Sequence, residues 1–370
     1  MKTTFSCRLF LSKMMFMRYF FILFAIAGLL INPSAAEACT GITLKSKDST
    51  TIVARTIEWG GSNLNSQYVV VPRGYTERSY TPNGVDGMTF TARYGYVGLA
   101  VEQKEFIAEG LNEVGLSAGL FYFPKYGEYE KYNAAVRDKS ISDLQLVSWL
   151  LGECSNVEAV KKGHVINIDP RASTVHWRFA EPSGRQLVLE IIKGELHFYE
   201  NTLGVLTNSP SFEWHLTNLN NYVNLFPGTA PNQQLGNIEL SSFGAGSGFL
   251  GIPGDVTPPS RFVRAAFYQA SAPQQETALE TVFQCFQILN NFDIPVGIEF
   301  PLGQVPCDIP SATQWTSVTD MRNHVIYYRT MYNSVIRNID LRSIDFSTVR
   351  YRAVSMDGTK RQAVETIKIE

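Results

Sequence analysis

The sequence predicts an α+β fold in which antiparallel sheets are covered by helices, and three observations indicate this class. Strand-like β-branched and aromatic runs dominate the first third of the chain. Helical patterns follow, and the later strands and helices come in blocks. The sequence lacks the regular strand–helix alternation that is typical of a doubly wound parallel sheet. No repeat or linker divides the chain after its leader, so we expect a single domain over residues 39–370.

The composition is that of a globular protein and argues against a nucleic-acid partner. The 370 residues are 45% hydrophobic and 18% charged, and 32 Lys and Arg against 34 Asp and Glu give a formal net charge of -2. Nucleic-acid binding proteins usually present a strongly basic surface, which this balance does not provide. Five cysteines are too few for a disulfide scaffold at this length.

Residues 1–38 have the three parts of a signal peptide. Four basic residues precede an apolar run over 19–31, which is short for a membrane span of ~20 residues. Ala36 and Ala38 then occupy the small-residue positions of a cleavage site. Cleavage after Ala38 would make Cys39 the first residue of a periplasmic or secreted protein.

Two alternatives to a cleaved signal peptide stay open. The apolar run could remain as an anchor helix, or Cys39 could be the lipid-modified residue of a lipoprotein. A lipoprotein signal normally has Leu three residues before the cysteine, where this chain has Ala36. No later run approaches membrane length, so we expect no membrane span in the mature chain.

The first half of the chain is predicted to consist of strands followed by two helices. The expected strands are 40–44, 51–57, 68–72, 94–101 and 116–123, each bounded by Gly, Asn, Asp or Ser clusters. The helices are expected over 142–151 and 155–162. In the second helix, Ser155 and Glu158 fit a capping box and Gly163 fits a C-cap.

The second half is predicted to continue with a strand meander and then amphipathic helices. The meander comprises 175–180, 186–192 and 195–199, with turns at 182–184 and 193–194. Helical periodicity follows over 212–225, 261–270 and 276–289, and Pro273 ends the second of these helices. A final strand is expected over 324–331.

Cys39 is the candidate nucleophile, because at the start of a mature chain it carries two useful groups. Its thiol attacks well once ionised. Its α-amino group has an ordinary pKa of about 7.7–8.0, so it can accept the thiol proton without a histidine. Arg55 lies near the end of the next strand-like run, and Glu58 lies just beyond it. An arginine there would favour the thiolate, and a carboxylate would orient the amino group. A surface ion pair between Arg55 and Glu58 is the alternative.

The chain resembles the choloylglycine hydrolases, cysteine N-terminal-nucleophile (Ntn) hydrolases that include bile salt hydrolases and penicillin V acylases. The resemblance covers nearly the whole mature chain and rests on seven blocks in the family's order. They are CTGITL, ARTIEW, EGLNEVGLSAGLFYFP, HWRFAEPSG, GVLTNSPSFEWHLTNLNNY, IPGDVTPPSRFVRAAF and QWTSVTDMRNHVIYYRT. The resemblance implies a four-layer αββα sandwich of antiparallel sheets.

The resemblance also implies catalytic roles for individual residues. Cys39 matches the nucleophile, and Arg55 matches the arginine beside its thiolate. Glu58 stands where family members commonly have Asp, so its side chain is one methylene longer. Asn208 matches an asparagine that contacts the tetrahedral intermediate, and Arg261 matches a second arginine of the site.

Tyr122 and Trp59 are expected on the substrate side of the site. The backbone N–H of Tyr122 matches the position that helps form the oxyanion hole. Bile salt hydrolases tend to have Asn there, so Tyr122 and Trp59 resemble the penicillin acylase branch and are expected to line the acyl pocket. Without the resemblance, Trp59 could be plain core and Asn208 an ordinary turn residue before Ser-Pro. Arg261 could then simply pair with Asp255.

Other motifs indicate no further chemistry. Residues 246–251 spell G-x-G-x-x-G but open no predicted helix, so we expect a loop. Ser117 in GLSAG lies in a strand-like run rather than at a nucleophile elbow. Neither C-x-x-C nor H-E-x-x-H is present to indicate a metal site. An oxidising compartment would permit one disulfide among Cys154, Cys285 and Cys307.

The sequence therefore predicts an exported amidase without cofactor or metal. Through a Cys39 thioester it would hydrolyse an amide between a hydrophobic acyl group and a polar amine. Penicillin V-like amides and N-acyl homoserine lactones are the expected substrates, and a conjugated bile salt hydrolase is the alternative. A catalytically silent, secreted or lipid-anchored binding protein is the alternative of another class. The family is often tetrameric, so a homotetramer is an expectation from the resemblance alone.

Overall fold

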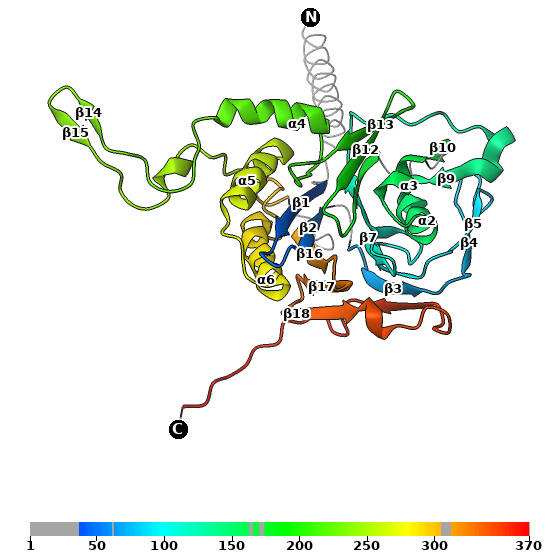
Figure 1. Ribbon diagram of the computed structural model, residues 1–370. Coiled ribbons are helices and arrows are strands. Elements are labelled where there is room, and N and C mark those ends of the chain that lie inside the picture. Colours follow the sequence, from blue (N-terminus) through cyan, green and yellow to red (C-terminus); the bar gives the residue numbers. More distant parts are fainter. Residues whose placement is uncertain (1–36, 61–62, 163–165, 170–173, 305–311, 370) are drawn as a thin grey trace, which may run out of the picture. The chain divides into compact units, whose positions relative to one another are not determined.

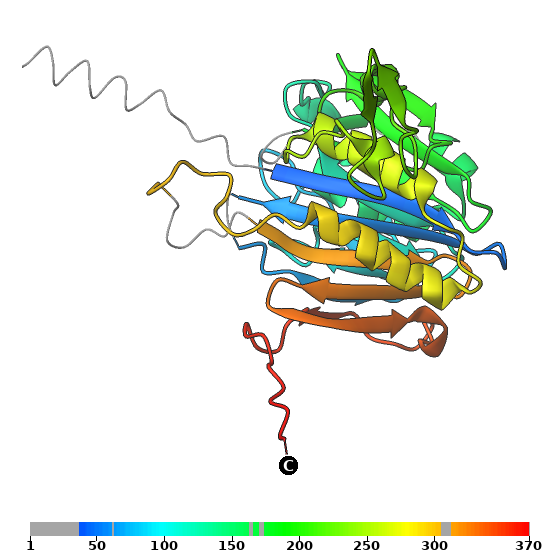
Figure 2. The same ribbon diagram turned by 90° about the vertical axis from the view of Figure 1, so that its left-hand side faces the viewer.

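Two antiparallel sheets form the centre of the structure, a computed structural model that describes residues 37–60, 63–162, 166–169, 174–304 and 312–369. Residues 36–370 form one compact unit, which Figures 1 and 2 show from two sides. The predicted signal peptide, apart from its last two residues, lies outside the described residues. Within the described ranges, no helix is both long enough and apolar enough to cross a membrane.

The first sheet joins two strands from the beginning of this unit to three strands from near its C-terminal end. Its strand order is β1-β2-β16-β17-β18, and all neighbours are antiparallel. The strands are β1 (Glu37–Lys45), β2 (Thr51–Trp59), β16 (Ala312–Asp320), β17 (Val325–Thr330) and β18 (Asn333–Asp340). β2 is buried along nearly its whole length, because it has a paired neighbour on each edge and a packed layer on each face.

The second sheet has eight strands in the order β13-β12-β11-β8-β7-β6-β3-β19. They are β3 (Gln67–Val71), β6 (Tyr96–Ala100), β7 (Ile107–Asn112), β8 (Ser117–Tyr122), β11 (Val175–Ala180), β12 (Gln186–Ile192), β13 (Glu195–Glu200) and β19 (Arg352–Ser355). Consecutive strands are mostly neighbours, as the predicted meander requires. Three two-stranded pairs lie outside the two large sheets: β4 (Thr76–Arg78) with β5 (Thr89–Thr91), β9 (Ser140–Ser142) with β10 (Ile166–Asp169), and β14 (Gln233–Leu235) with β15 (Ile238–Leu240).

Helices cover the outer face of each large sheet. α5 (Pro258–Ser271) and α6 (Ala278–Leu289) pack on the first sheet, and α2 (Leu146–Glu153) packs on the second. Figure 2 shows α5 and α6 lying along the strands of the first sheet. The remaining α-helices of the described chain are α3 (Val157–Lys162) and α4 (Phe212–Asn218). The architecture is an α+β sandwich with the layer order αββα, which confirms the predicted fold class.

The predicted helices are present, but several begin or end elsewhere. The helix expected over 142–151 begins at Leu146, because the preceding residues form β9 and a 3-10 turn. The predicted capping box at Ser155 is wrong. Asn156 Oδ1 accepts the N–H of Ala159 at 2.9 Å, while the Glu158 carboxylate pairs with an arginine instead. Gly163 lies outside the described residues.

The later helices show the same pattern of correct type and shifted ends. The helix expected over 212–225 ends at Asn218 and continues as a short 3-10 turn. α5 begins at Pro258, because proline fits the first helical position, where no intrahelical N–H donor is needed. A capping box does form at α6, between Thr277 and Glu280. The sequence prediction missed β7, β16, β18 and β19 of the two large sheets, and it also missed the short strands of the two-stranded pairs.

Candidate active site

Cys39 lies in β1, and its side chain is buried, with 4% of its surface exposed. It is paired with Ile57 of β2, and Gly41 is paired with Arg55. Because side chains alternate along a strand, these four residues share one face of the sheet. Gly41 presents no side chain on that face, and the space that a Cβ atom would need is occupied by Arg178 Nη1 and the Phe121 ring.

The guanidinium group of Arg55 is fully buried and held by backbone carbonyls. Its Nη1 donates to the carbonyls of Ala108 (3.0 Å) and Leu120 (2.6 Å) in the second sheet, and its Nε donates to the Thr56 carbonyl (3.2 Å). Its Nη2 lies 2.8 Å from Cys39 Sγ. Burial raises the pKa of the Cys39 thiol, and the positive charge of Arg55 opposes that rise by favouring the thiolate.

Asn208 and Arg261 hold the backbone of Cys39. The Cys39 N–H donates to Asn208 Oδ1 at 2.7 Å, and Arg261 Nη2 donates to the same oxygen at 2.7 Å. Arg261 Nη1 donates to the Cys39 carbonyl (2.6 Å) and to Thr40 Oγ1 (2.8 Å). Asp255, the alternative partner of Arg261, accepts hydrogen bonds from hydroxyl groups of its own turn instead. The proposed Arg261–Asp255 pair is therefore not formed.

Glu58 lies in β2 and is buried, with 1% of its surface exposed. Its Oε1 accepts a hydrogen bond from Thr313 Oγ1 (3.1 Å), and its Oε2 has no hydrogen-bond partner among the described residues. Burial raises the pKa of Glu58 to about 7, against the opposing effect of the Arg261 charge. Glu58 makes no hydrogen bond to Cys39 N, which in this structure is a peptide N–H that follows Ala38 and donates to Asn208. Ala38 is the residue directly opposite Glu58 in the strand register.

A narrow apolar pocket of about 80 Å³ opens beside Cys39. It is lined by Cys39, Ile57, Glu58, Trp59, Leu64, Val101, Glu102, Leu120, Tyr122, Leu144 and Val175. The rings of Trp59 and Tyr122 meet edge to face across it, with centroids 6.2 Å apart. A backbone hydrogen bond from Tyr122 reaches the Cys39 thiol, and Asn208 Nδ2 donates to the Tyr122 carbonyl at 2.8 Å. Four of the predicted site residues therefore line this pocket, and the other three, Arg55, Asn208 and Arg261, each contact Cys39.

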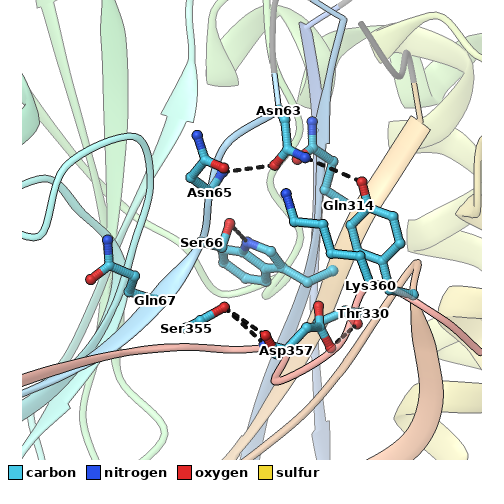
Figure 3. Close-up of a pocket in the computed structure, with 11 residues that line it drawn as sticks. Asn63, Asn65, Ser66, Gln67, Gln314, Thr330, Ser355, Asp357 and Lys360 are labelled. Atoms are coloured by element: carbon cyan, nitrogen blue, oxygen red, sulfur yellow. Dashed lines mark hydrogen bonds between the residues drawn. The ribbon is translucent and has the colours of Figure 1, made fainter. Parts of the chain in front are cut away.

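A larger polar pocket of about 350 Å³ lies between β16, β17 and the segments 63–67 and 355–360 (Figure 3). Gln314 connects it to the apolar pocket, because its Nε2 donates to the Trp59 carbonyl (3.3 Å) and its Oε1 accepts the Leu64 N–H (3.0 Å). Figure 3 shows Asp357 and Thr330 at the opposite end of this pocket from Asn63 and Asn65. None of the sequence-predicted site residues lines this pocket.

His215, which is not one of the predicted site residues, is buried behind Asn208. Its Nε2 lies 2.8 Å from the Asn208 carbonyl and therefore carries the proton, since a carbonyl oxygen only accepts. Burial lowers the pKa of His215 to about 4, and its ring stacks on Phe262 with centroids 4.5 Å apart. The sequence gives no signal for this contact, because it joins a side chain to a backbone carbonyl. The sequence prediction missed Glu109 and Arg178, two residues that are buried behind Arg55.

The competing motifs hold no second reaction centre. Ser117 is buried in β8 and donates to Glu109 Oε1 (3.2 Å), so it is not an exposed nucleophile at an elbow. Residues 246–251 contain only a short 3-10 turn. Cys154 and Cys285 are free and buried, and Cys307 lies outside the described residues. Within the described residues, no group of three or more His, Cys, Asp or Glu side chains is placed to hold a metal ion.

Comparison with known proteins gives the family. Residues 39–354 match the model of the linear amide C–N hydrolases, choloylglycine hydrolase family. A bile salt hydrolase/transferase from Lactiplantibacillus plantarum is 33% identical over 82% of this chain and 92% of its own length. A penicillin V acylase from Pectobacterium atrosepticum is 25% identical over 83% of this chain and 81% of its own length.

A solved structure extends the comparison to three dimensions. A variant of the conjugated bile acid hydrolase from Clostridium perfringens matches with a TM-score of 0.75 at 29% identity, covering 89% of this chain and 100% of that one. The family match begins at Cys39, the residue around which the predicted site residues gather. The chain belongs to the choloylglycine hydrolase family and is a linear amide C–N hydrolase.

Proposed function

We propose that the mature protein is an exported amidase whose Cys39 forms a thioester with a hydrophobic acyl group. One observation carries this proposal. The nitrogen and the sulfur of Cys39 lie in one buried polar cluster, the nitrogen 2.7 Å from Asn208 Oδ1 and the sulfur 2.8 Å from Arg55 Nη2. The beginning of the family match at Cys39 and the signal-peptide pattern before it support this proposal.

Cleavage after Ala38 would turn the Cys39 nitrogen into an amino group that accepts the thiol proton. The resulting ammonium has three N–H donors, and Asn208 Oδ1 satisfies one of them. Glu58 Oε2 is a buried oxygen without a hydrogen-bond partner among the described residues, and the residue opposite Glu58 is the Ala38 that cleavage removes. Glu58 therefore takes the role of second acceptor for the ammonium, and ionised Glu58 would stabilise its charge.

The reaction then proceeds in two acyl-transfer steps. The Cys39 thiolate attacks the amide carbonyl, a C–S bond forms, and the C–N bond breaks as the α-ammonium gives its proton to the leaving amine. Water next attacks the thioester, with the α-amino group as base, and the carboxylic acid and the free thiol are released. The Tyr122 N–H and the second N–H of Asn208 Nδ2 would donate to the oxyanion in both steps.

The apolar pocket supports a compact acyl group such as phenoxyacetyl or a short acyl chain. The pocket is small, at about 80 Å³, so a flat ring or a short chain fits it better than a bulky steroid does. We therefore place penicillin V-like amides and N-acyl homoserine lactones first. The similarity to a bile salt hydrolase/transferase at 33% identity favours conjugated bile salts as the second candidate.

Parallel hydrolysis assays on one preparation test the proposal. Penicillin V, an N-acyl homoserine lactone and glycocholate are compared by kcat/KM, with Cys39→Ala as the inactive control. We expect one of the first two substrates to exceed glycocholate by at least about tenfold, a preference worth about 1.4 kcal/mol. A preference for glycocholate would replace the first candidate with the second. No turnover and no labelling of Cys39 by a thiol-reactive acyl probe would favour a silent binding protein.

We also propose that the protein assembles as a homotetramer. The β14–β15 hairpin stands at the end of an arm that extends away from the two large sheets (Figure 1). Leu235 and Ile238 on this hairpin are 65% and 61% exposed, and Phe243 beside it is fully exposed. An apolar arm of this kind supports burial against another copy of the chain.

A further inference from the structure

A buried ion cluster lies behind Arg55, and the proposed chemistry does not use it. Arg178 in β11 donates through Nη2 to both carboxylate oxygens of Glu109 in β7, at 3.2 and 3.3 Å. Arg55 Nη1 lies 3.7 Å from Glu109 Oε2. All three side chains are at least 98% buried. Two arginines thus share one carboxylate, and one of them contacts the Cys39 sulfur.

The surrounding backbone leaves room for this cluster at two glycines. A Cβ atom at Gly119 would lie 2.1 Å from Glu109 Oε2, and one at Gly41 would lie 2.9 Å from Arg178 Nη1. No side chain fits at the first of these positions unless the carboxylate moves. The Phe121 ring lies against both guanidinium groups, with its centroid 4.3 Å from Arg55 Cζ and 5.5 Å from Arg178 Cζ.

The charges of the cluster explain how Arg178 affects the electrostatic field at the Cys39 sulfur. Arg55 and Glu109 alone would be a neutral pair, in which the carboxylate cancels much of the field of Arg55 at the Cys39 sulfur. Arg178 compensates Glu109, so the three groups together carry one net positive charge. Among the described residues, Arg55 and Arg178 are the cations that pair with Glu109, so without Arg178 the carboxylate would draw Arg55 away from the sulfur.

We propose that Glu109 and Arg178 are positioning residues of the amidase proposed above: Arg178 holds the Glu109 carboxylate, and Arg55 thereby stays directed at the Cys39 sulfur. Arg178 is not among the groups that act most strongly on the thiol. Those groups are Arg55 and Glu58 from β2, Arg261 from α5, the Tyr122 N–H from β8, and the α-amino group that cleavage would create on Cys39 itself. A change in thiol reactivity on substitution of Arg178 therefore reports on Arg55.

The test is the pH profile of Cys39 alkylation by iodoacetamide in the purified mature protein. Mass spectrometry of the Cys39 peptide separates this thiol from Cys154 and Cys285. We expect Arg178→Met to slow alkylation at pH 7 about tenfold and to move the profile about one pH unit upward. Arg178→Lys keeps the charge but loses the two-fold contact with the carboxylate, so its profile should lie between those of Arg178→Met and the parent.

The double variant Glu109→Gln/Arg178→Met distinguishes positioning from a structural role. It leaves no unpaired buried carboxylate, and Arg55 keeps its three carbonyl acceptors, so the parent profile should return within about threefold. The double variant and Arg178→Lys carry the test if Arg178→Met fails to fold. A folded Arg178→Met with the parent profile, or a double variant as slow as the single one, would overturn the proposal.

Arg337→Met is the matched control. Arg337 lies in β18 and donates to Asp357 at 3.1 Å. It also contacts the Met356 carbonyl, Thr330 and the Tyr328 ring, none of which belongs to the active site. The alkylation profile of Arg337→Met should equal that of the parent. If Arg337→Met slows alkylation as much as Arg178→Met does, the effect comes from lost stability and the proposal is overturned. Alkylation requires no amide turnover. Failure of the parent to hydrolyse any amide would therefore reject the proposed function and leave the Arg178 effect measurable.

Discussion

At the scale of single residues, Cys39 and Glu58 carry the chemistry of the proposal. Cys39 contacts Arg55 through sulfur and Asn208 through nitrogen, so both of its reactive atoms have fixed surroundings. Glu58 keeps one buried oxygen without a hydrogen-bond partner among the residues described. A buried polar atom without a partner is unfavourable in a stable protein, and a newly formed ammonium beside it would remove that penalty.

Replacement of the nucleophile should separate turnover from folding. We expect Cys39→Ala to lower kcat at least about a thousandfold, because no other group is placed to form the thioester. Cys39→Ser should retain little activity, since a hydroxyl group is a poorer nucleophile beside an amine base. Hydrolysis rates and thermal unfolding curves check both variants. An active, folded Cys39→Ala protein would refute the role of Cys39.

Glu58 should make stability depend on pH in a chain that retains the residues before Cys39. Burial raises the pKa of Glu58 from 4.5 to about 7, so the folded state binds the proton more tightly than the unfolded state does. This contribution to stability is complete below pH ~4.5 and is lost as the pH rises through about 7. In a chain beginning with Met before Glu37, Glu58→Gln should abolish this loss of about 3 kcal/mol. Urea unfolding at several pH values measures it.

Processing to Cys39 should change that pH dependence. An ammonium beside Glu58 favours the carboxylate and lowers its pKa, so the loss of stability between pH ~4.5 and ~7 should shrink in the mature protein. Unfolding of the parent and of Glu58→Gln, each with and without the residues before Cys39, provides the comparison. The same Glu58→Gln effect in both chain forms would place the ammonium away from Glu58.

At the scale of elements, the sequence predicted strands with clear apolar periodicity and missed those without it. β16 reads ATQWTSVTD, a largely polar segment, yet all nine of its residues are buried. It lies between β2 and β17 with helix α6 on one face, and its polar side chains are buried in that environment. Burial of this kind comes from long-range pairing, so local sequence could not predict it.

The same distinction explains which site residues could be predicted. Cys39, Arg55 and Glu58 lie on paired strands near the predicted leader, and the family blocks identified the others. Glu109 and Arg178 lie in strands of the second sheet, and their ion pair exists only because β7 and β11 flank β8. Their contact with Arg55 joins the two sheets, and no periodicity within one strand encodes it.

The arm that carries the β14–β15 hairpin should govern assembly. We expect Leu235→Ser/Ile238→Ser to shift a tetramer towards smaller species, because the substitutions remove exposed apolar surface that assembly would bury. Light scattering coupled to size-exclusion chromatography measures the mass. Val85→Ser is the matched control, since Val85 is also exposed (52%) but lies near β4 and β5. A monomeric parent, or a double variant with the parent's mass, would contradict this assignment.

At the scale of the whole molecule, the two sheets bury an unusual concentration of positive charge around one thiol. Arg55, Arg178 and Arg261 are each at most 1% exposed, although the chain as a whole has a net charge of -2. Each is held by backbone carbonyls, and Arg178 also by a carboxylate, which offsets the cost of removing its charge from water. The positive charges of Arg55 and Arg261 in this buried environment oppose the rise that burial causes in the pKa of the Cys39 thiol.

The most direct test of the account is the first residue of the active protein recovered from its natural host. We predict that intact-mass analysis and N-terminal sequencing will find Cys39 first, with a free α-amino group, in every fraction that hydrolyses amide. An active fraction that retains any residue before Cys39, or whose Cys39 nitrogen is acylated, would contradict the account, because the base of the proposed reaction would then be missing.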